Sequence, residues 1–362
     1  MLFRSVDPDE RINCPGGYRL GNRFFRCDAT HGSVDMRRAV EQSCNTYFWA
    51  MAHRVGYDAI APVAKLLGLG EEFDLPGTAQ RYGTVPDAAW KMRRYKQKWT
   101  AADSLNASIG QGYVSVSPLQ LAVMTARIAS GKNLQPSLIY GREKPPGPPL
   151  PFTPEQLAVT HEGMFRVVNG NGTAGGSKID IGGIKMAGKT GTAQVRALVT
   201  RGHFGDWKGR DHALFVCYAP ADAPRYAMAV VVEHGTFGAR AAAPIAKDVM
   251  TFLFDPDAAL ARLHELEKAW GGTSVQRMDS KYRSFVSQYG TSAPKVGDEE
   301  TVKDTIKKAD NPEPPPEAQS APATTPPEEP QGALGPVSTP APVPPAGPTA
   351  TVPPAPASGT PQ

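Results

Sequence analysis

The sequence lacks any apolar run near the 18 or so residues that a membrane span needs, and its first residues, 1–4, lack the apolar stretch of a signal peptide. Four cysteines are too few for a disulfide scaffold. The formal charge of +4 is small, and no segment combines dense Lys and Arg with interleaved aromatics, which disfavours nucleic-acid binding. Taken alone, the sequence predicts a soluble chain with no anchor or signal of its own.

Proline is abundant only at the C-terminal end, where 18 of the 36 prolines lie between Asn311 and Gln362. That stretch has almost no aromatics, so it cannot bury enough apolar surface to offset the entropy of ordering it. We therefore expect a disordered Pro/Ala-rich tail over 291–362. A helical extension is expected over 257–290, and a single partial domain over 1–256.

Apolar spacing and capping residues indicate helices in the first two thirds of that domain. Two helices should meet at a polar turn around Ser43-Cys44-Asn45, and the sequences Ser117-Pro118-Leu119-Gln120 and Thr153-Pro154-Glu155-Gln156 are typical of capped helix starts. A long polar connection is expected over 75–106. The elements expected on this basis are helices within 33–55, at 56–69, from 117 to about 131 and from 153 to about 169, strands at 184–195, 212–219 and 226–233, and a helix at 243–254.

The three expected strands are joined by connections too short for parallel crossovers, so the sheet should be antiparallel. Helices followed by such a sheet and a covering helix predict the α+β class.

The segment from Gly183 to Thr190 fits the pattern G-x-x-x-x-G-K-[ST] of a phosphate-binding loop, so a P-loop nucleotide hydrolase is an alternative. That pattern needs a strand before it and a helix after it. Here Gly191 follows at once and Thr192 to Val195 has an extended pattern. The context therefore disfavours the phosphate loop.

Lys189-Thr190-Gly191 is also the third signature of the penicillin-recognising serine acyltransferases. On an edge strand, Gly191 would let a substrate backbone lie close alongside, and Lys189 would supply positive charge for a carboxylate. Thr190 and Thr192 add hydroxyls, and the amide of Thr192 could face a developing oxyanion. Taken alone, a tripeptide of this kind favours an ordinary strand that contains a turn.

Ser43-Cys44-Asn45 matches the second signature, Ser-x-Asn, in which the hydroxyl can relay a proton and the Asn amide can hold a peptide group. Together with the order of the signatures and the flanking segments 106–113, 117–122, 187–194 and 211–215, it resembles the class B penicillin-binding proteins of the elongation type, penicillin-binding protein 2. The resemblance runs from about Ile12 to Phe254.

The resemblance implies the penicillin-binding, serine β-lactamase-like transpeptidase fold, truncated at its N-terminus, and a D,D-transpeptidase that cross-links D-Ala-D-Ala stem peptides through an acyl-serine intermediate. Ser43, Asn45 and Lys189 would be catalytic, and Thr190, Gly191 and Thr192 would bind substrate. The implied partners are stem peptides, β-lactams and the cell-elongation machinery, including a glycosyltransferase. The implied location is the periplasmic face of the inner membrane.

The family's nucleophile, the serine of Ser-x-x-Lys, precedes Ser-x-Asn, but none of the 42 residues before Ser43 forms that pattern. The one literal match, Ser292-Ala293-Pro294-Lys295, lies beside the expected tail and carries a helix-breaking proline. We therefore expect the chain to begin just after the catalytic helix. It should form no adduct with a β-lactam and should be unstable or aggregation-prone alone. An inert or binding-only fragment is the second alternative.

Cys14, Cys27, His31 and Cys44 form a set of soft ligands suited to tetrahedral zinc. Some penicillin-binding protein 2 relatives carry zinc in this region, with one ligand from the middle of Ser-x-Asn, so the resemblance supports a structural zinc. A disulfide among the three cysteines or reduced buried cysteines are the alternatives. Cys217 lies in an apolar strand and is expected in the core.

Overall fold

The structure is a computed structural model. It describes residues 6–76, 80, 83–139, 141, 144–145, 147–179, 181–195 and 209–289. The expected tail and Ser292-Ala293-Pro294-Lys295 lie outside them, as does Met1-Leu2-Phe3-Arg4. Two compact units divide the chain, 1–280 and 281–362. None of the helices in the described segments is both long and apolar enough to cross a membrane.

Two small antiparallel hairpins, one nested inside the other, precede the first described helix, and no sequence pattern predicted them. β1 (Ile12–Cys14) pairs antiparallel with β4 (Gly32–Val34), and β2 (Gly17–Leu20) pairs with β3 (Arg23–Arg26). These strands have only three or four residues each. They are too short for an alternating pattern to stand out, so packing against the rest of the chain must select them.

The helices α2 (Met36–Glu41) and α3 (Asn45–Val55) meet at Ser43, as the sequence predicted. α4 (Tyr57–Leu66) follows directly.

The expected polar connection over 75–106 is wrong, because it contains α5 (Ala88–Tyr95) and most of α6 (Ala101–Ser108). The side chain of Asp87 caps α5, and a capping box between Thr100 and Asp103 starts α6. The low apolar content of α5 and α6 gives no clear apolar face, so the apolar spacing did not predict these helices. Their starts are defined by local capping residues instead.

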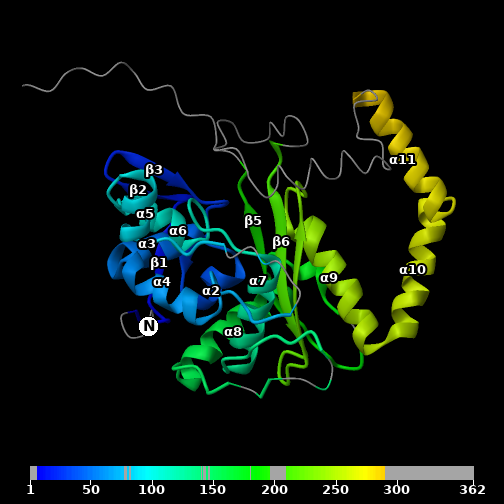
Figure 1. Ribbon diagram of the computed structural model, residues 1–362, viewed down its shortest axis with the longest axis horizontal. Coiled ribbons are helices and arrows are strands. Elements are labelled where there is room, and N and C mark those ends of the chain that lie inside the picture. The colour runs from blue at the N-terminus through cyan, green and yellow to red at the C-terminus, as the bar shows by residue number, and fades with distance from the viewer. Residues whose placement is uncertain are drawn as a thin grey trace, which may run out of the picture. The chain divides into compact units, whose positions relative to one another are not determined.

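The two capped starts at Ser117 and Thr153 are confirmed. α7 (Pro118–Ser130) and α8 (Pro154–Asn169) both begin with proline after a complete capping box, and α7 ends at Gly131 in the left-handed conformation. Figure 1 shows these two helices below and beside the sheet.

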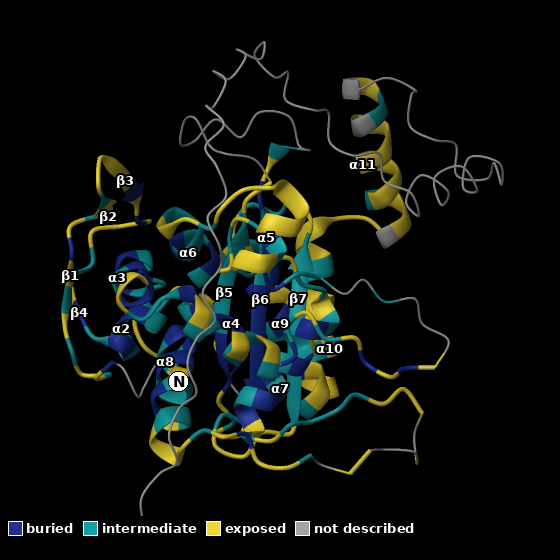
Figure 2. Ribbon diagram, turned by 60° about the vertical axis from the view of Figure 1, so that its left-hand side comes forward, coloured by how far each residue is buried: buried dark blue, intermediate teal, exposed yellow. Residues whose placement is uncertain are grey.

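The central sheet has the order β5-β6-β7 and is antiparallel throughout, as predicted. Its strands are β5 (Ala187–Ala193), β6 (His212–Ala219) and β7 (Tyr226–Val232). β6 is buried on both faces (Figure 2), because alternate side chains point to opposite sides. Phe215 and Cys217 join the core with Ala242 and Ala246 of α9 (Gly238–Phe254), while Val216 and Tyr218 pack on the α7 and α8 side. Cys217 is therefore a core residue, as expected.

α9 begins at Gly238, five positions before the expected start, and continues through Pro244 in its second turn. α10 (Pro256–Trp270) and α11 (Ser274–Tyr289) follow it, and α10 has no buried residue. The core of the fold thus lies between α9 on one side of the sheet and α7 and α8 on the other. Because β5 is the outer strand of this α+β sheet, one of its edges is free to border a site.

Candidate active site

Ser43 occupies the turn between α2 and α3 in a conformation that serine rarely adopts, with φ of +54°. The Cys44 N–H donates to the carbonyl of Ala39 at 2.9 Å and the Ser43 N–H to that of Val40 at 3.3 Å. These are the two bonds of a helix end that normally carries glycine at this position. The left-handed backbone costs a non-glycine residue roughly 1–2 kcal/mol. A half-buried serine in a strained conformation points to a functional site.

Lys189 lies on β5 and reaches across to this turn. Its Nζ donates hydrogen bonds to Ser43 Oγ and, at 2.9 Å, to the carbonyl of Thr190. Burial lowers the pKa of Lys189 to about 8, and the negative charge of Asp28 partly offsets that effect. A lysine with this pKa can both attract a carboxylate and exchange a proton near neutral pH.

Thr190, Gly191 and Thr192 continue β5 beyond Lys189, with β6 on one side of the strand. The strand runs unbroken to Ala193, so no helix follows Lys189-Thr190 as a phosphate loop requires. Gly191 is also in tight backbone contact. A Cβ on Gly238, at the start of α9, would lie 2.7 Å from the Gly191 carbonyl oxygen. The start of α9 therefore packs directly against the backbone of β5 at Gly191.

Asn45 is the first residue of α3 and is half-buried, two positions from Ser43. The structure thus brings Ser43 and Lys189 into direct contact, and Asn45 begins the helix that follows Ser43. Together, β5 and the segment from Ser43 to Asn45 carry an ammonium group, a hydroxyl, a side-chain amide and strand backbone groups. That combination can bind a peptide with a terminal carboxylate.

The four expected metal ligands also converge. One ligand atom from each of Cys14, Cys27, His31 and Cys44 lies within 4.8 Å of every other. His31 Nδ1 is 3.5 Å from the sulfurs of both Cys14 and Cys27. The three cysteines are buried and free, and Cys14 Sγ also lies 3.1 Å from Thr46 Oγ1. The cluster ties both hairpins to the turn that carries Ser43.

The thiols of Cys27 and Cys44 interact directly. A hydrogen bond from Cys44 lowers the pKa of Cys27 to about 4, and the same bond, together with burial, raises the pKa of Cys44. One of these two sulfurs is therefore readily ionised, which suits a metal ligand because the thiolate is the form that binds.

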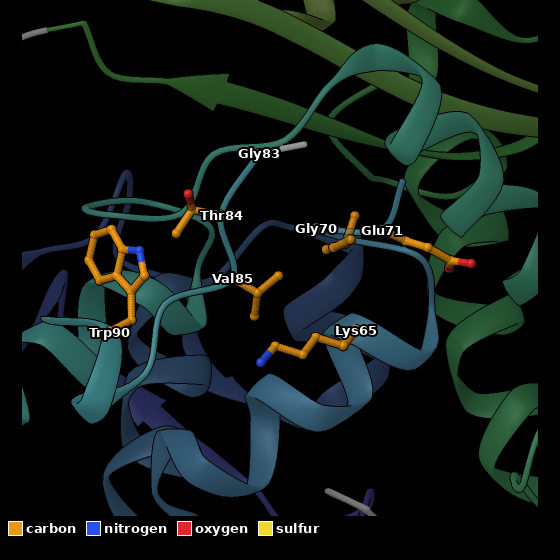
Figure 3. A pocket seen from close by; sticks show the side chains of 8 residues that line it. Lys65, Gly70, Glu71, Gly83, Thr84, Val85 and Trp90 are labelled. Carbon is orange, nitrogen blue, oxygen red and sulfur yellow. The ribbon is translucent and has the colours of Figure 1, made fainter. Parts of the chain in front are cut away.

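A separate pocket lies beside α4, bordered by Lys65, Gly83, Val85 and Trp90. In Figure 3 the Glu71 side chain points away from it, and the Glu71 carboxylate pairs with Arg127 at 2.8 Å. None of the site residues expected from the sequence lines this pocket. The candidate active site is therefore at Ser43 and Lys189 instead.

Two site residues were missed in the sequence. Thr173 Oγ1 lies 2.7 Å from Thr190 Oγ1, and the carboxamide of Gln111 bonds to the backbone of Thr192 and Gln194. Thr173 follows a glycine-rich loop, and Gln111 lies between two glycines in the segment 106–113 that contributes to the resemblance. The side-chain partners of both residues lie at least 17 positions away in the sequence, so no local pattern predicted these contacts.

The sequence matches the penicillin-binding protein transpeptidase domain over residues 4–251. The chain therefore belongs to that family, and its fold is the penicillin-binding transpeptidase fold, as the resemblance implied.

Its relatives include proteins of the penicillin-binding protein 2 type. The peptidoglycan D,D-transpeptidase MrdA of Acinetobacter baumannii is 35% identical over 274 residues, which are 70% of this chain and 40% of that protein. Penicillin-binding protein 2 of Pseudomonas aeruginosa, in complex with WCK 5153, is 34% identical with a TM-score of 0.61, covering 70% of this chain and 56% of that one. The complex of penicillin-binding protein 2 and MreC from Helicobacter pylori gives 27% identity and a TM-score of 0.63, covering 70% and 47%. The chain thus spans about 40% of the length of that curated relative.

Proposed function

We propose that this chain forms the substrate-binding part of a peptidoglycan D,D-transpeptidase of cell elongation. The observation that carries the proposal is the hydrogen bond from Lys189 Nζ to Ser43 Oγ, which joins two family signatures across the edge of β5. Membership of the transpeptidase domain family supports it. In the reaction, a serine oxygen attacks the carbonyl of the penultimate D-Ala, and the terminal D-Ala leaves with a proton. An amino group of a second stem then attacks the acyl-serine, releases the serine oxygen and forms the cross-link.

Each residue has a role in that scheme. Lys189 and Thr190 would hold the terminal carboxylate, Asn45 would hold a peptide group of the stem, and the Thr192 amide would face the oxyanion. Ser43, in contact with the ammonium of Lys189, would pass a proton between the leaving group and the lysine.

The nucleophilic serine is the part of the scheme that this sequence does not supply. No Ser-x-x-Lys lies in the segments that the structure describes, and the single match in the sequence is at Ser292. We therefore propose that the chain binds stem peptides and β-lactams without being acylated on its own. On this proposal, the isolated polypeptide binds its ligands but does not catalyse the reaction.

Titration with Nα,Nε-diacetyl-L-lysyl-D-alanyl-D-alanine, followed by NMR of the labelled chain, tests the proposal. We expect shifts at Thr190 to Thr192, and loss of binding in Lys189→Met and Thr190→Val. Lys178→Met is a matched control, because Lys178 is exposed and lies outside the strand. Labelled penicillin should leave no covalent band. Peptide binding that survives Lys189→Met, or a covalent adduct on this chain, would contradict the assignment.

We further propose that Cys14, Cys27, His31 and Cys44 hold a structural zinc ion. Tetrahedral zinc at about 2.3 Å from sulfur and about 2.0 Å from nitrogen places its ligand atoms roughly 3.5–3.8 Å apart. The observed limit of 4.8 Å and the two 3.5 Å contacts of His31 fit a site that needs little rearrangement. The ion would supply a rigid cross-link between the hairpins and the Ser43 turn.

Elemental analysis of the purified chain tests the metal. One zinc per chain is expected, falling well below that in Cys27→Ala, while Cys217→Ala should keep it because Cys217 lies in the sheet core, outside the cluster. Zinc-free protein that retains its fold would exclude the proposal.

We also propose the partners and the location of the protein, with support from its relatives. The complex with MreC supports the cell-elongation machinery as the partner, and we propose a glycosyltransferase within it, since cross-linking acts on newly made glycan strands. We propose that the protein works at the periplasmic face of the inner membrane. Co-purification with MreC of the same organism is the direct test.

A further inference from the structure

Gln111 occupies the free edge of β5. Its Nε2 donates to the carbonyl oxygen of Thr192 at 2.6 Å, and the backbone N–H of Gln194 donates to its Oε1 at 3.3 Å. The single carboxamide of Gln111 therefore forms hydrogen bonds with both a backbone carbonyl and a backbone N–H that point outward from the strand edge. These are the groups that a peptide laid along the edge would use.

The neighbouring outward carbonyl on β5, that of Thr190, also accepts a hydrogen bond from within the chain. Residues two apart on a strand point their backbone groups to the same side, so Thr190 and Thr192 share the free edge. Lys189 Nζ donates to the Thr190 carbonyl at 2.9 Å. Both outward carbonyls of the substrate strand are thus bonded within the chain, one by a lysine of the site and one by Gln111.

The Gln111 side chain can leave the edge of β5 without a change in the neighbouring helix. Gly110 and Gly112 on either side have φ of +75° and +71°, and a Cβ on Gly110 would meet nothing within 4 Å. The Gln111 backbone N–H is held separately, by the Asn106 carbonyl at 2.9 Å. Rotation of the side chain alone would therefore free the strand edge while the end of α6 stays in place.

We propose that Gln111 is a built-in competitor for the substrate: its carboxamide takes the place of a stem-peptide group on β5 and must swing away before the peptide can pair there. The inference rests on the proposed function, because it concerns the peptide that would bind along β5. A different role, in which Gln111 merely braces the end of β5, makes the opposite prediction. Removing a brace weakens peptide binding, whereas removing a competitor strengthens it.

Titration of the whole 362-residue chain with Nα,Nε-diacetyl-L-lysyl-D-alanyl-D-alanine separates the two roles. Replacing Gln111 removes two hydrogen bonds that the peptide has to displace, so Gln111→Ala should bind roughly tenfold more tightly. Ser108→Ala is the matched control, since the Ser108 hydroxyl donates to the Leu105 carbonyl within the same segment, and the affinity of this variant should equal that of the unaltered chain.

Two further readouts make the outcome decisive. In the free chain, the Gln194 amide should exchange with solvent faster in Gln111→Ala, and the Gln111 side-chain NH₂ signals should shift when peptide binds. Equal or weaker peptide affinity in Gln111→Ala, with an unchanged melting temperature, overturns the competitor role while leaving the proposed function standing. Absence of peptide binding in all three proteins overturns the proposed function and this inference with it.

Discussion

Lys189 and Ser43 are 146 positions apart in the sequence, yet the ammonium nitrogen of one bonds to the hydroxyl of the other. The contact joins an edge strand to a strained turn between two helices.

Replacing Ser43 by glycine should stabilise the chain. Glycine adopts the left-handed conformation without the roughly 1–2 kcal/mol cost that other residues carry. Ser43→Ala removes the same hydroxyl but keeps the strain, so it is the matched comparison. We expect the melting temperature of Ser43→Gly to exceed that of Ser43→Ala by several degrees. Equal melting temperatures would show that the turn is not strained.

Peptide binding should weaken as the pH rises through about 8. The pKa of Lys189 is lowered to about 8, so the ammonium that attracts the carboxylate is lost above that pH. Affinity for the D-Ala-D-Ala peptide, measured from pH 7 to 10, should fall accordingly. Lys189→Arg keeps its charge throughout this range, and any binding it retains should be flat with pH. A decline of the same size in both proteins would rule out Lys189 as its cause.

The lowered pKa of Lys189 also predicts how the free energy of unfolding changes with pH. Because the folded-state pKa lies below the ordinary value of 10.5, the unfolded chain binds more protons between pH 8 and 10.5. The free energy of unfolding contributed by Lys189 should therefore rise with pH through that window, and the burial cost is fully present below it. Denaturant unfolding of the unaltered chain and of Lys189→Met should differ most at neutral pH and least near pH 10.5.

Gly238→Ala should disturb the substrate strand. Its Cβ would lie 2.2 Å from the Leu214 carbonyl oxygen and 2.7 Å from that of Gly191, so the helix and strand must separate. Overpacking of this kind costs about 1–3 kcal/mol. Gly176→Ala is the control, because a Cβ there meets nothing within 4 Å. Thermal unfolding should show a clear loss for the first variant and little change for the second.

Chelation should loosen the Ser43 turn. If zinc joins Cys44 to the two hairpins, EDTA should lower the melting temperature and also the affinity for the peptide, since Cys44 is next to Ser43. Zinc added back should restore both. A chelator that lowers neither would leave the cluster without a role in the site.

β7 should promote self-association. Within the described sheet it pairs only with β6, and a bare strand edge invites pairing between chains. Val231 is half-buried on β7, and Val231→Lys adds a charge to this edge strand. Light scattering at rising concentration should show less association in that variant than in Val231→Thr.

Local signals explain what the sequence could predict. The capping boxes at Ser117 and Thr153 start helices wherever they occur, because the bonds lie within four residues of each other. The same rule applied at Thr100 predicts the start of α6, but the polar composition from Leu75 to Asn106 is typical of a loop. The apolar run from His212 to Ala219 likewise predicted the strand β6. That both of its faces are buried became clear only from the packing of α9 on one side and of α7 and α8 on the other.

The sequence by itself determined the class of the fold, the family signatures and the soft ligand types of the metal cluster, since each is written in residues close together in the chain. Only the tertiary structure decided which of these groups meet. Ser43 reaches Lys189, four ligands converge from two hairpins and a turn, and Gln111 lies on the strand edge of Thr192 because packing of α9 and the helices on the other face fixes β5. Contacts between distant segments depend on the whole core, and no local pattern encodes them.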